Sequence, residues 1–182
     1  MSEPVLINSN KALLRLAAIN IALWLVSKGI SEALAPWSLG IYVGALYIIV
    51  PALVMPFYMG IAWVCVWGFW VDASLSWPFG LSSLAWTACF TGIAFIRDRF
   101  AWPAFQEGLW IAPLMNSLLI LLMGFLAKPS AVDWALYGPL LATTWMVSTV
   151  VLLILVGPIL SLQLRALGLS TLAHEPSEGY GA

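Results

Sequence analysis

Charged residues are scarce in this chain. Among 182 residues there are seven Lys and Arg, eight Asp and Glu and one His, so that only 8% of the residues are charged. A soluble domain with so few charges would expose a large apolar surface that promotes aggregation, whereas a surface facing lipid needs no charge. With 63% hydrophobic residues and a mean hydropathy of +1.00, the chain is predicted to be an all-α, polytopic integral membrane protein.

Residues that carry chemistry are equally scarce. Cys65 and Cys89 lie inside apolar runs without a nearby His or second Cys, and we interpret them as small buried hydrophobic residues. His174 stands alone in the polar C-terminal stretch. The sequence has no phosphate-binding glycine loop, no nucleophile–base pair and no metal-ligand cluster, and its net charge of −1 gives no argument for nucleic acid. We therefore predict a protein that is not an enzyme and has no catalytic residue, cofactor or metal.

The apolar runs predict about six membrane-spanning helices. A span needs about 20 residues, and a single helix over residues 39–71 would be about 48 Å long, which is too long for one crossing. We therefore divide that stretch near Pro56. The predicted spans are 12–35, 39–56, 57–72, 81–96, 107–127 and 134–162. Together they form one transmembrane domain, residues 1–164, followed by a polar cytoplasmic tail, residues 165–182.

Basic residues test this division, because Lys and Arg accumulate on the cytoplasmic side of a membrane. Six spans with a cytoplasmic N-terminus leave only Lys28 and Lys128 outside. The basic residues on the cytoplasmic side are then Lys11, Arg15, Arg97, Arg99 and Arg165. Treating 39–71 as one span would place three basic residues inside and four outside. The charges therefore favour six spans with both termini in the cytoplasm.

A few polar residues interrupt the spans. Asn20 and Asn116 lie within predicted helices, where amides usually form hydrogen bonds between helices. Lys28 and Glu32 are four residues apart on one helix face and are expected to form an exposed ion pair. Glu107 opens the fifth span, and Thr143, Thr144 and Ser148 are expected to bond backbone carbonyls of their own helix. These groups are too few to line an ion pathway.

Tryptophan, in contrast, is abundant, with eleven copies. Five lie at or near the ends of apolar runs, where an amphipathic ring prefers the membrane interface: Trp37, Trp77, Trp102, Trp110 and Trp134. Five lie within runs: Trp63, Trp67, Trp70, Trp86 and Trp145. We expect the second group to pack between helices, an interpretation favoured over an aromatic ligand box because helix bundles need large rings in any case.

Small residues recur at the spacing that lets two helices approach closely. Ala18 and Ala22 form one such pair, and Gly40 and Gly44 form another. We predict helix-packing positions at these four residues. The partner of each pair can lie in the same chain or in another one.

Asp72 follows a long apolar run and precedes the turn-rich segment 73–80. Taken alone, this residue is best interpreted as solvated, because an ionisable group near a helix end reaches water cheaply; a helix-terminal cap and a pivot in a packed turn are the alternatives. Its surroundings form a pattern, however. Gly68 lies four residues earlier, Pro78 and Gly80 close the segment, and Gly60 lies eight residues before Gly68.

The stretch from Gly60 to Arg99 resembles the MreD family, the small membrane subunit of the bacterial rod-shape machinery, in its Gly-x-x-x-Asp element, its Pro-x-Gly turn and its following basic loop. The resemblance implies a non-catalytic scaffold in the bacterial cytoplasmic (inner) membrane. Such a scaffold binds the bitopic protein MreC, and so couples MreB filaments to the glycosyltransferase RodA and a penicillin-binding transpeptidase that synthesise peptidoglycan. Gly60, Gly68, Asp72, Pro78 and Gly80 are then a structural motif that shapes a docking surface.

A different class of protein has a similar size and number of spans. The substrate-binding membrane subunit of an energy-coupling-factor vitamin transporter docks its partner through small residues of its first helix, a role that Ala18 and Ala22 are placed to fill. Such a subunit needs a polar ligand pocket that opens outward. The predicted outer loops offer few polar groups, so the sequence favours the scaffold.

Overall fold

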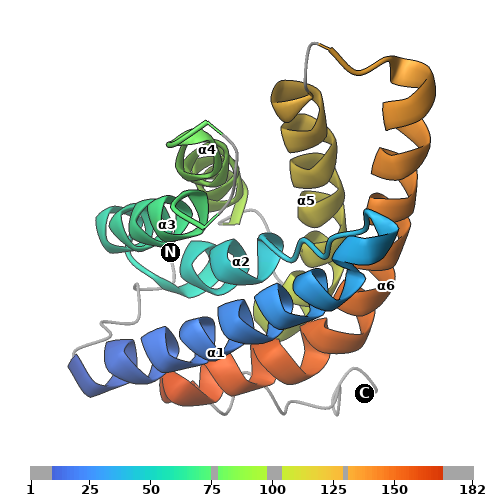
Figure 1. Cartoon of the computed structure of the whole chain (residues 1–182). Coiled ribbons are helices and arrows are strands. Elements are labelled where there is room, and N and C mark those ends of the chain that lie inside the picture. Colours follow the sequence, from blue (N-terminus) through green and yellow to red (C-terminus); the bar gives the residue numbers. More distant parts are fainter. Residues whose placement is uncertain (1–9, 75–77, 98–103, 129–130, 170–182) are drawn as a thin grey trace, which may run out of the picture.

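Six α-helices make up most of the chain, and the described residues contain no β-strand. The computed structural model describes residues 10–74, 78–97, 104–128 and 131–169. The helices are α1 (Asn10–Leu34), α2 (Ala45–Val54), α3 (Phe57–Asp72), α4 (Leu81–Ile96), α5 (Ala104–Ala127) and α6 (Trp134–Ala166), and a short 3-10 helix, η1 (Ala35–Trp37), extends α1 (Figure 1). The predicted all-α fold is confirmed.

The outer surface is that of a membrane protein. Among the described residues, three helical stretches are long and apolar enough to cross a bilayer, namely Asn10–Trp37, Gly108–Leu126 and Trp134–Ala166. Large apolar side chains project outward from all three, for example Leu14, Leu114 and Ile154, which are 69%, 70% and 68% exposed. Side chains of this kind are stable outside a fold only when lipid surrounds them. Helices α2, α3 and α4 are shorter, with 10, 16 and 16 residues.

Helix α2 lies at the centre of the molecule, and here the predicted span 39–56 is wrong in its extent. Every residue from Ala45 to Ala52 is buried. The helix is about 15 Å long, half the thickness of a bilayer core. It ends at Val54 because Met55 precedes Pro56, and a residue before proline is driven out of the helical region.

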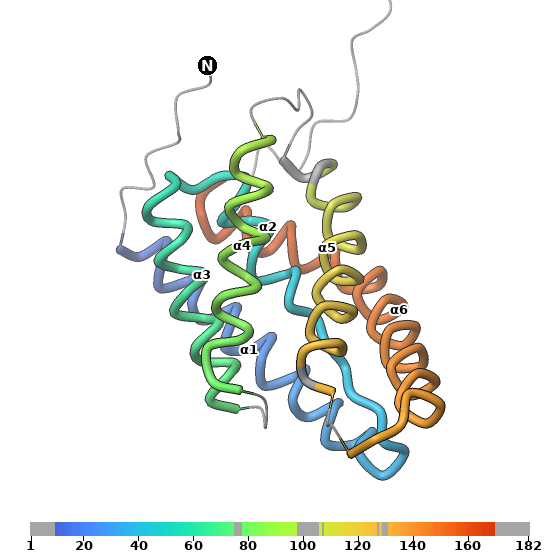
Figure 2. Tube along the Cα trace, turned by 90° about the horizontal axis from the view of Figure 1, so that it is seen from above, coloured from blue at the N-terminus to red at the C-terminus, as the bar shows by residue number. Residues whose placement is uncertain are grey.

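The other helices surround α2. Figure 1 shows α3 and α4 packed together on one side of α2, with α5 and α6 on the other and α1 running along α6. In Figure 2, the beginning of α1, the end of α4, the beginning of α5 and the end of α6 lie toward one end of the molecule. The end of α1, the end of α3, the beginning of α4, the end of α5 and the beginning of α6 lie toward the other end.

Helix α6 continues beyond its predicted end. Its 33 residues correspond to about 50 Å, and Pro139 and Pro158 lie inside it. A proline inside a helix removes one backbone hydrogen bond and favours a bend, and Figure 1 shows α6 descending beside α5 before turning to follow α1. The predicted tail from Arg165 begins too early, because Ala166 and Leu167 are buried and Gly168, with φ 79°, ends the helix.

Candidate functional site

Asp72 is buried and joins the end of α3 to the beginning of α4. Its side chain is 3% exposed. One carboxylate oxygen, Oδ2, accepts hydrogen bonds from the backbone N–H groups of Gly80 and Ser83 at 3.0 and 3.2 Å, and Oδ1 accepts one from Ser82 N–H at 2.9 Å. These donors belong to the first turn of α4, where backbone N–H groups have no partner within the helix and where the helix dipole favours a negative charge. Asp72 is therefore a cap for α4, and the interpretation as a solvated loop residue is wrong.

Three glycines let the backbone adopt this arrangement. A Cβ on Gly68 would lie 2.4 Å from Ser83 Cα, so only glycine allows α3 and α4 to come this close at that level. A Cβ on Gly60 would lie 2.5 Å from the ring of Phe90, farther along the same helix pair. Gly80 has φ 93°, a left-handed conformation that side chains disfavour. Gly68 thus lies at a close approach of α3 and α4, and Asp72 bonds the backbone at the beginning of α4.

A groove lies on the outer side of the Asp72 cap. It has a volume of about 550 Å³ and is lined by Cys65, Phe69, Pro78, Phe79, Gly80, Leu81, Ser83, Leu84 and Thr87. The rings of Phe69 and Phe79 stack with their centroids 5.5 Å apart, and Phe79 and Leu84 are 71% and 72% exposed. We call these residues the α3–α4 groove. Its walls offer apolar contacts and few hydrogen-bonding groups, so that it suits an apolar chain segment.

Asn116, on α5, supports the non-helical segment 38–44 where that segment enters the core. Its amide Nδ2 donates a hydrogen bond to Tyr42 O at 2.9 Å, and its Oδ1 accepts one from Ala45 N–H at 3.4 Å. Ser148, on α6, accepts a hydrogen bond from Tyr42 N–H at 3.0 Å. These side chains replace water for backbone groups buried at membrane depth. Asn116 bonds between elements as predicted, whereas the expectation that Ser148 serves its own helix is wrong.

Two further amides, those of Gln163 and Asn20, also support α2. Gln163, on α6, is fully buried, and its Nε2 donates hydrogen bonds to Asn20 Oδ1 at 2.9 Å and to Leu46 O at 3.1 Å. The predicted interhelical hydrogen bond of Asn20 is therefore confirmed. Sequence reasoning missed Gln163, because it lies one residue past the predicted end of the sixth span.

Arg97 holds the other end of α2. Its guanidinium Nη1 donates hydrogen bonds to Ala52 O and Met55 O at 3.2 and 2.8 Å. A cation at a helix C-terminus is favoured by the helix dipole and satisfies carbonyls that have no helical partner. Arg97 thus links the end of α4 to the end of α2.

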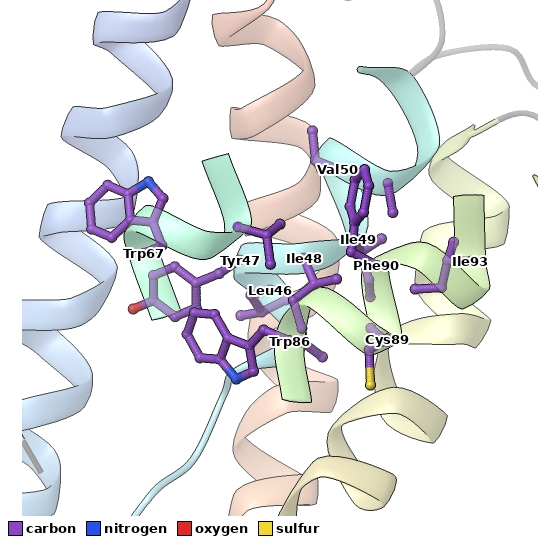
Figure 3. Close-up of a cluster of buried hydrophobic side chains, with 14 of the residues drawn as sticks. Leu46, Tyr47, Ile48, Ile49, Val50, Trp67, Trp86, Cys89, Phe90 and Ile93 are labelled. Carbon is purple, nitrogen blue, oxygen red and sulfur yellow. The ribbon is translucent and has the colours of Figure 1, made fainter. Parts of the chain in front are cut away.

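A second hollow lies where α1, the segment 41–44, α2, α3 and α4 converge. Its volume is about 120 Å³, and its lining residues are Trp24, Ser27, Lys28, Ser31, Ile41, Tyr42, Val43, Gly44, Tyr47, Val71, Ser74 and Trp86. We call it the Trp24 cavity. The rings of Tyr47 and Trp86 stack within it at a centroid distance of 5.3 Å and an interplanar angle of 16°, and Figure 3 shows them side by side. Trp86 Nε1 also donates a hydrogen bond to Tyr42 Oη at 2.6 Å.

The two predicted helix-packing pairs differ in position, and the prediction is wrong only for Gly40 and Gly44, which are not helical. Ala18 and Ala22 lie on the exposed face of α1, so this pair is not an internal contact of the chain. Gly40 and Gly44 precede α2 and are not part of a helix. A Cβ on Gly44 would meet the ring of Tyr42 at 2.7 Å, whereas one on Gly40 would meet nothing within 4 Å. Spacing alone misled here, because it carries no information on where a helix begins.

The remaining predicted residues have varied outcomes. Lys28 and Glu32 form an exposed ion pair at 3.9 Å, as predicted. Both cysteines are free, Cys89 being buried and Cys65 half-buried. Trp67 and Trp86 are buried as expected, whereas Trp70 is 50% exposed although its ring contacts that of Trp24 at 5.9 Å. The side chain of Glu107 and the residues 98–103, 129–130 and 170–182 lie outside the described part, including Asp98, Arg99 and His174.

No chemistry beyond binding is visible in the part of the chain that the structure describes. That part contains no group of three or more His, Cys, Asp or Glu side chains able to hold a metal ion. The buried carboxylate of Asp72 is occupied by three backbone N–H groups. The chain matches no protein-family model, no curated protein and no solved structure.

Proposed function

We propose that this protein is a non-catalytic membrane scaffold of the bacterial cell-elongation machinery, similar to MreD. The observation that carries the proposal is the buried Asp72 cap. The Gly68–Gly80 pattern that resembles the family pattern is, in space, one compact structural unit, with its carboxylate bonded to three backbone N–H groups and its glycine at a close contact of two helices. A unit of this kind fixes a surface rather than performs a reaction.

The proposed docking surface is the α3–α4 groove, and its proposed occupant is the single membrane helix of an MreC-like bitopic protein. The groove is apolar, is held in shape by the Asp72 cap, and presents Phe79 and Leu84 to the outside. In lipid, helices associate through shape complementarity and close packing more than through charge. The bound partner would connect the scaffold to MreB filaments inside the cell and to RodA and its transpeptidase.

We propose further that the chain crosses the bacterial inner membrane six times with both termini in the cytoplasm. The distribution of charge over the two ends of the molecule supports this. Lys11, Arg15, Arg97 and Arg165 belong to the helix ends gathered at one end in Figure 2, and Lys28 and Lys128 belong to those at the other end. Such an imbalance is typical of cytoplasmic and outer faces.

Purification in a mild detergent from the native host, with mass spectrometry of the retained proteins, tests the scaffold. We expect recovery of an MreC-like bitopic protein. Phe79→Ala should reduce that recovery about tenfold, because truncating an aromatic anchor of an interface costs more than about 1 kcal/mol. Phe95→Ala is the matched control. Phe95 lies on α4, the helix that follows Phe79, is 74% exposed and contacts the ring of Phe57. Equal recovery with both variants would overturn the docking surface.

The vitamin-transporter subunit remains a second candidate, because Ala18 and Ala22 of α1 are exposed and free to contact a partner. In that case the partner protein would bind the exposed pair Ala18 and Ala22 and would not bind the α3–α4 groove. Co-purification of a transport ATPase that is lost in Ala18→Leu and retained in Phe79→Ala would establish this alternative and exclude the scaffold.

A further inference from the structure

The Trp24 cavity has the construction of a small-ligand site. It is formed by side chains from α1, α2, α3 and α4 and by the segment 41–44, so that its shape depends on the whole helix arrangement. Ser31 fastens α1 to this segment, since Ser31 Oγ accepts a hydrogen bond from Ile41 N–H at 3.0 Å and donates one to Ile41 O at 3.3 Å. A ligand in this cavity would not depend on the scaffold function.

The volume of the cavity limits the ligand to about one ring. It measures about 120 Å³. An apolar protein cavity of about 150 Å³ binds benzene, so a six-membered ring is the largest rigid group that this cavity is expected to accept without rearrangement. A vitamin with two fused rings and a side chain would exceed it.

The walls favour a flat aromatic ring. Tyr47 and Trp86 present a stacked pair that is 3% and 0% exposed, so their positions are fixed by packing. Trp24, from α1, lines the cavity too. Aromatic rings gain about 0.5–1.5 kcal/mol per pair beyond simple burial when they stack with an offset or meet edge to face.

The polar groups of the cavity determine the charge of the ligand. Lys28 Nζ is its only cation among the described residues, and the ion pair with Glu32 is long and solvated, with the two side chains 47% and 70% exposed. A pair of this kind contributes little and exchanges partners easily. Ser27 and Ser74 donate their hydroxyl hydrogens to Leu23 O and Trp70 O, which leaves their oxygens as acceptors.

From this geometry we infer that the Trp24 cavity binds a planar, single-ring aromatic carboxylate. The ring occupies the space beside Tyr47 and Trp86, and the carboxylate binds Lys28 at the end of the cavity near Ser31. The serine oxygens accept hydrogen bonds from ring substituents that carry an N–H or O–H. The site therefore selects flat monocyclic acids against aliphatic acids and against aromatic amines.

Equilibrium dialysis with radiolabelled benzoate tests the site on the purified full-length protein in detergent micelles, with protein-free micelles as the background. We expect saturable binding at one molecule per chain. Benzylamine has the same ring with the opposite charge and should not show saturable binding. Absence of saturable benzoate binding, or equal binding of benzylamine, would overturn the inference.

Two variants locate the binding. Lys28→Met should weaken benzoate binding about tenfold, the effect expected for loss of a hydrogen bond between charged groups. Its matched control is Lys128→Met, because Lys128 also lies over a tryptophan ring, at 5.1 Å from its centroid against 5.2 Å for Lys28. Ser27→Leu should abolish binding by filling the cavity. Its control, Ser161→Leu, also replaces a serine bonded to a carbonyl of its own helix.

The unfolding temperature of each variant separates loss of the site from loss of the fold. If Ser27→Leu does not fold, the comparison of Lys28→Met with Lys128→Met alone decides whether benzoate binds in the Trp24 cavity. Unchanged benzoate binding in Lys28→Met, in a protein that unfolds at the wild-type temperature, would refute the placement of the carboxylate.

Discussion

Replacing Asp72 by alanine removes the cap of α4 and leaves three backbone N–H groups without their acceptor. Each hydrogen bond to a charged group contributes about 1.5–3 kcal/mol to stability. Part of this loss is offset, because the variant no longer buries a carboxylate that is 3% exposed in the wild type. We expect Asp72→Ala to lower the free energy of unfolding by about 3–5 kcal/mol.

Asp72→Asn should have a smaller effect. The asparagine amide retains one oxygen, which satisfies either Ser82 N–H or the pair that Oδ2 now accepts from Gly80 and Ser83. Its NH₂ group faces the remaining donors and cannot accept from them. The expected loss is about 1–3 kcal/mol.

Unfolding by SDS, titrated into mild-detergent micelles and followed by tryptophan fluorescence, measures these differences. Asp133→Ala is the control, because Asp133 is an exposed N-cap residue whose side chain makes no capping hydrogen bond. It should change stability by less than about 0.5 kcal/mol. If Asp72→Ala proved as stable as Asp133→Ala, the assignment of Asp72 as the cap of α4 would be refuted.

Five further substitutions test other parts of the structure with the same titration. Gly68→Ala should cost about 1–3 kcal/mol by forcing α4 away, whereas Gly92→Ala, where a Cβ meets nothing within 4 Å, should be neutral or stabilising by up to about 1 kcal/mol. Asn116→Leu should cost about 2–4 kcal/mol, since it orphans one buried N–H and one buried C=O. Ala18→Leu and Ala22→Leu should leave stability within about 0.5 kcal/mol of wild type, and a larger loss would contradict their outward orientation.

Local sequence was sufficient to predict the class of protein and most helix positions. Apolar runs and turn residues are short-range signals, and the helices α3 and α4 begin and end where the sequence predicts them. For Asp72 the sequence offered a helix-terminal cap only as an alternative to a solvated residue, although its partners lie only eight to eleven residues away. The glycine of the motif and its acid are on adjoining turns of one helix, so that their cooperation is visible in the sequence.

The non-helical conformation of the segment 38–44 before α2 was not predictable from local sequence. An apolar stretch of this length is consistent with a spanning helix, and nothing local distinguishes it from a short helix buried on all sides. The segment becomes non-helical because amides and hydroxyls from distant helices satisfy its backbone. Ser148 lies 106 residues from Tyr42, and Asn116, which also bonds the backbone of Tyr42, lies 74 residues from it.

What the sequence determined by itself was therefore the lipid-facing composition and the helical character, since each depends on residues that are close together along the chain. Only the tertiary structure decided which polar residues support α2, that Ala18 and Ala22 face outward, and that aromatic side chains of α1, α2 and α4 enclose a cavity. These features depend on which helix faces which, and that choice is made by packing across the whole bundle.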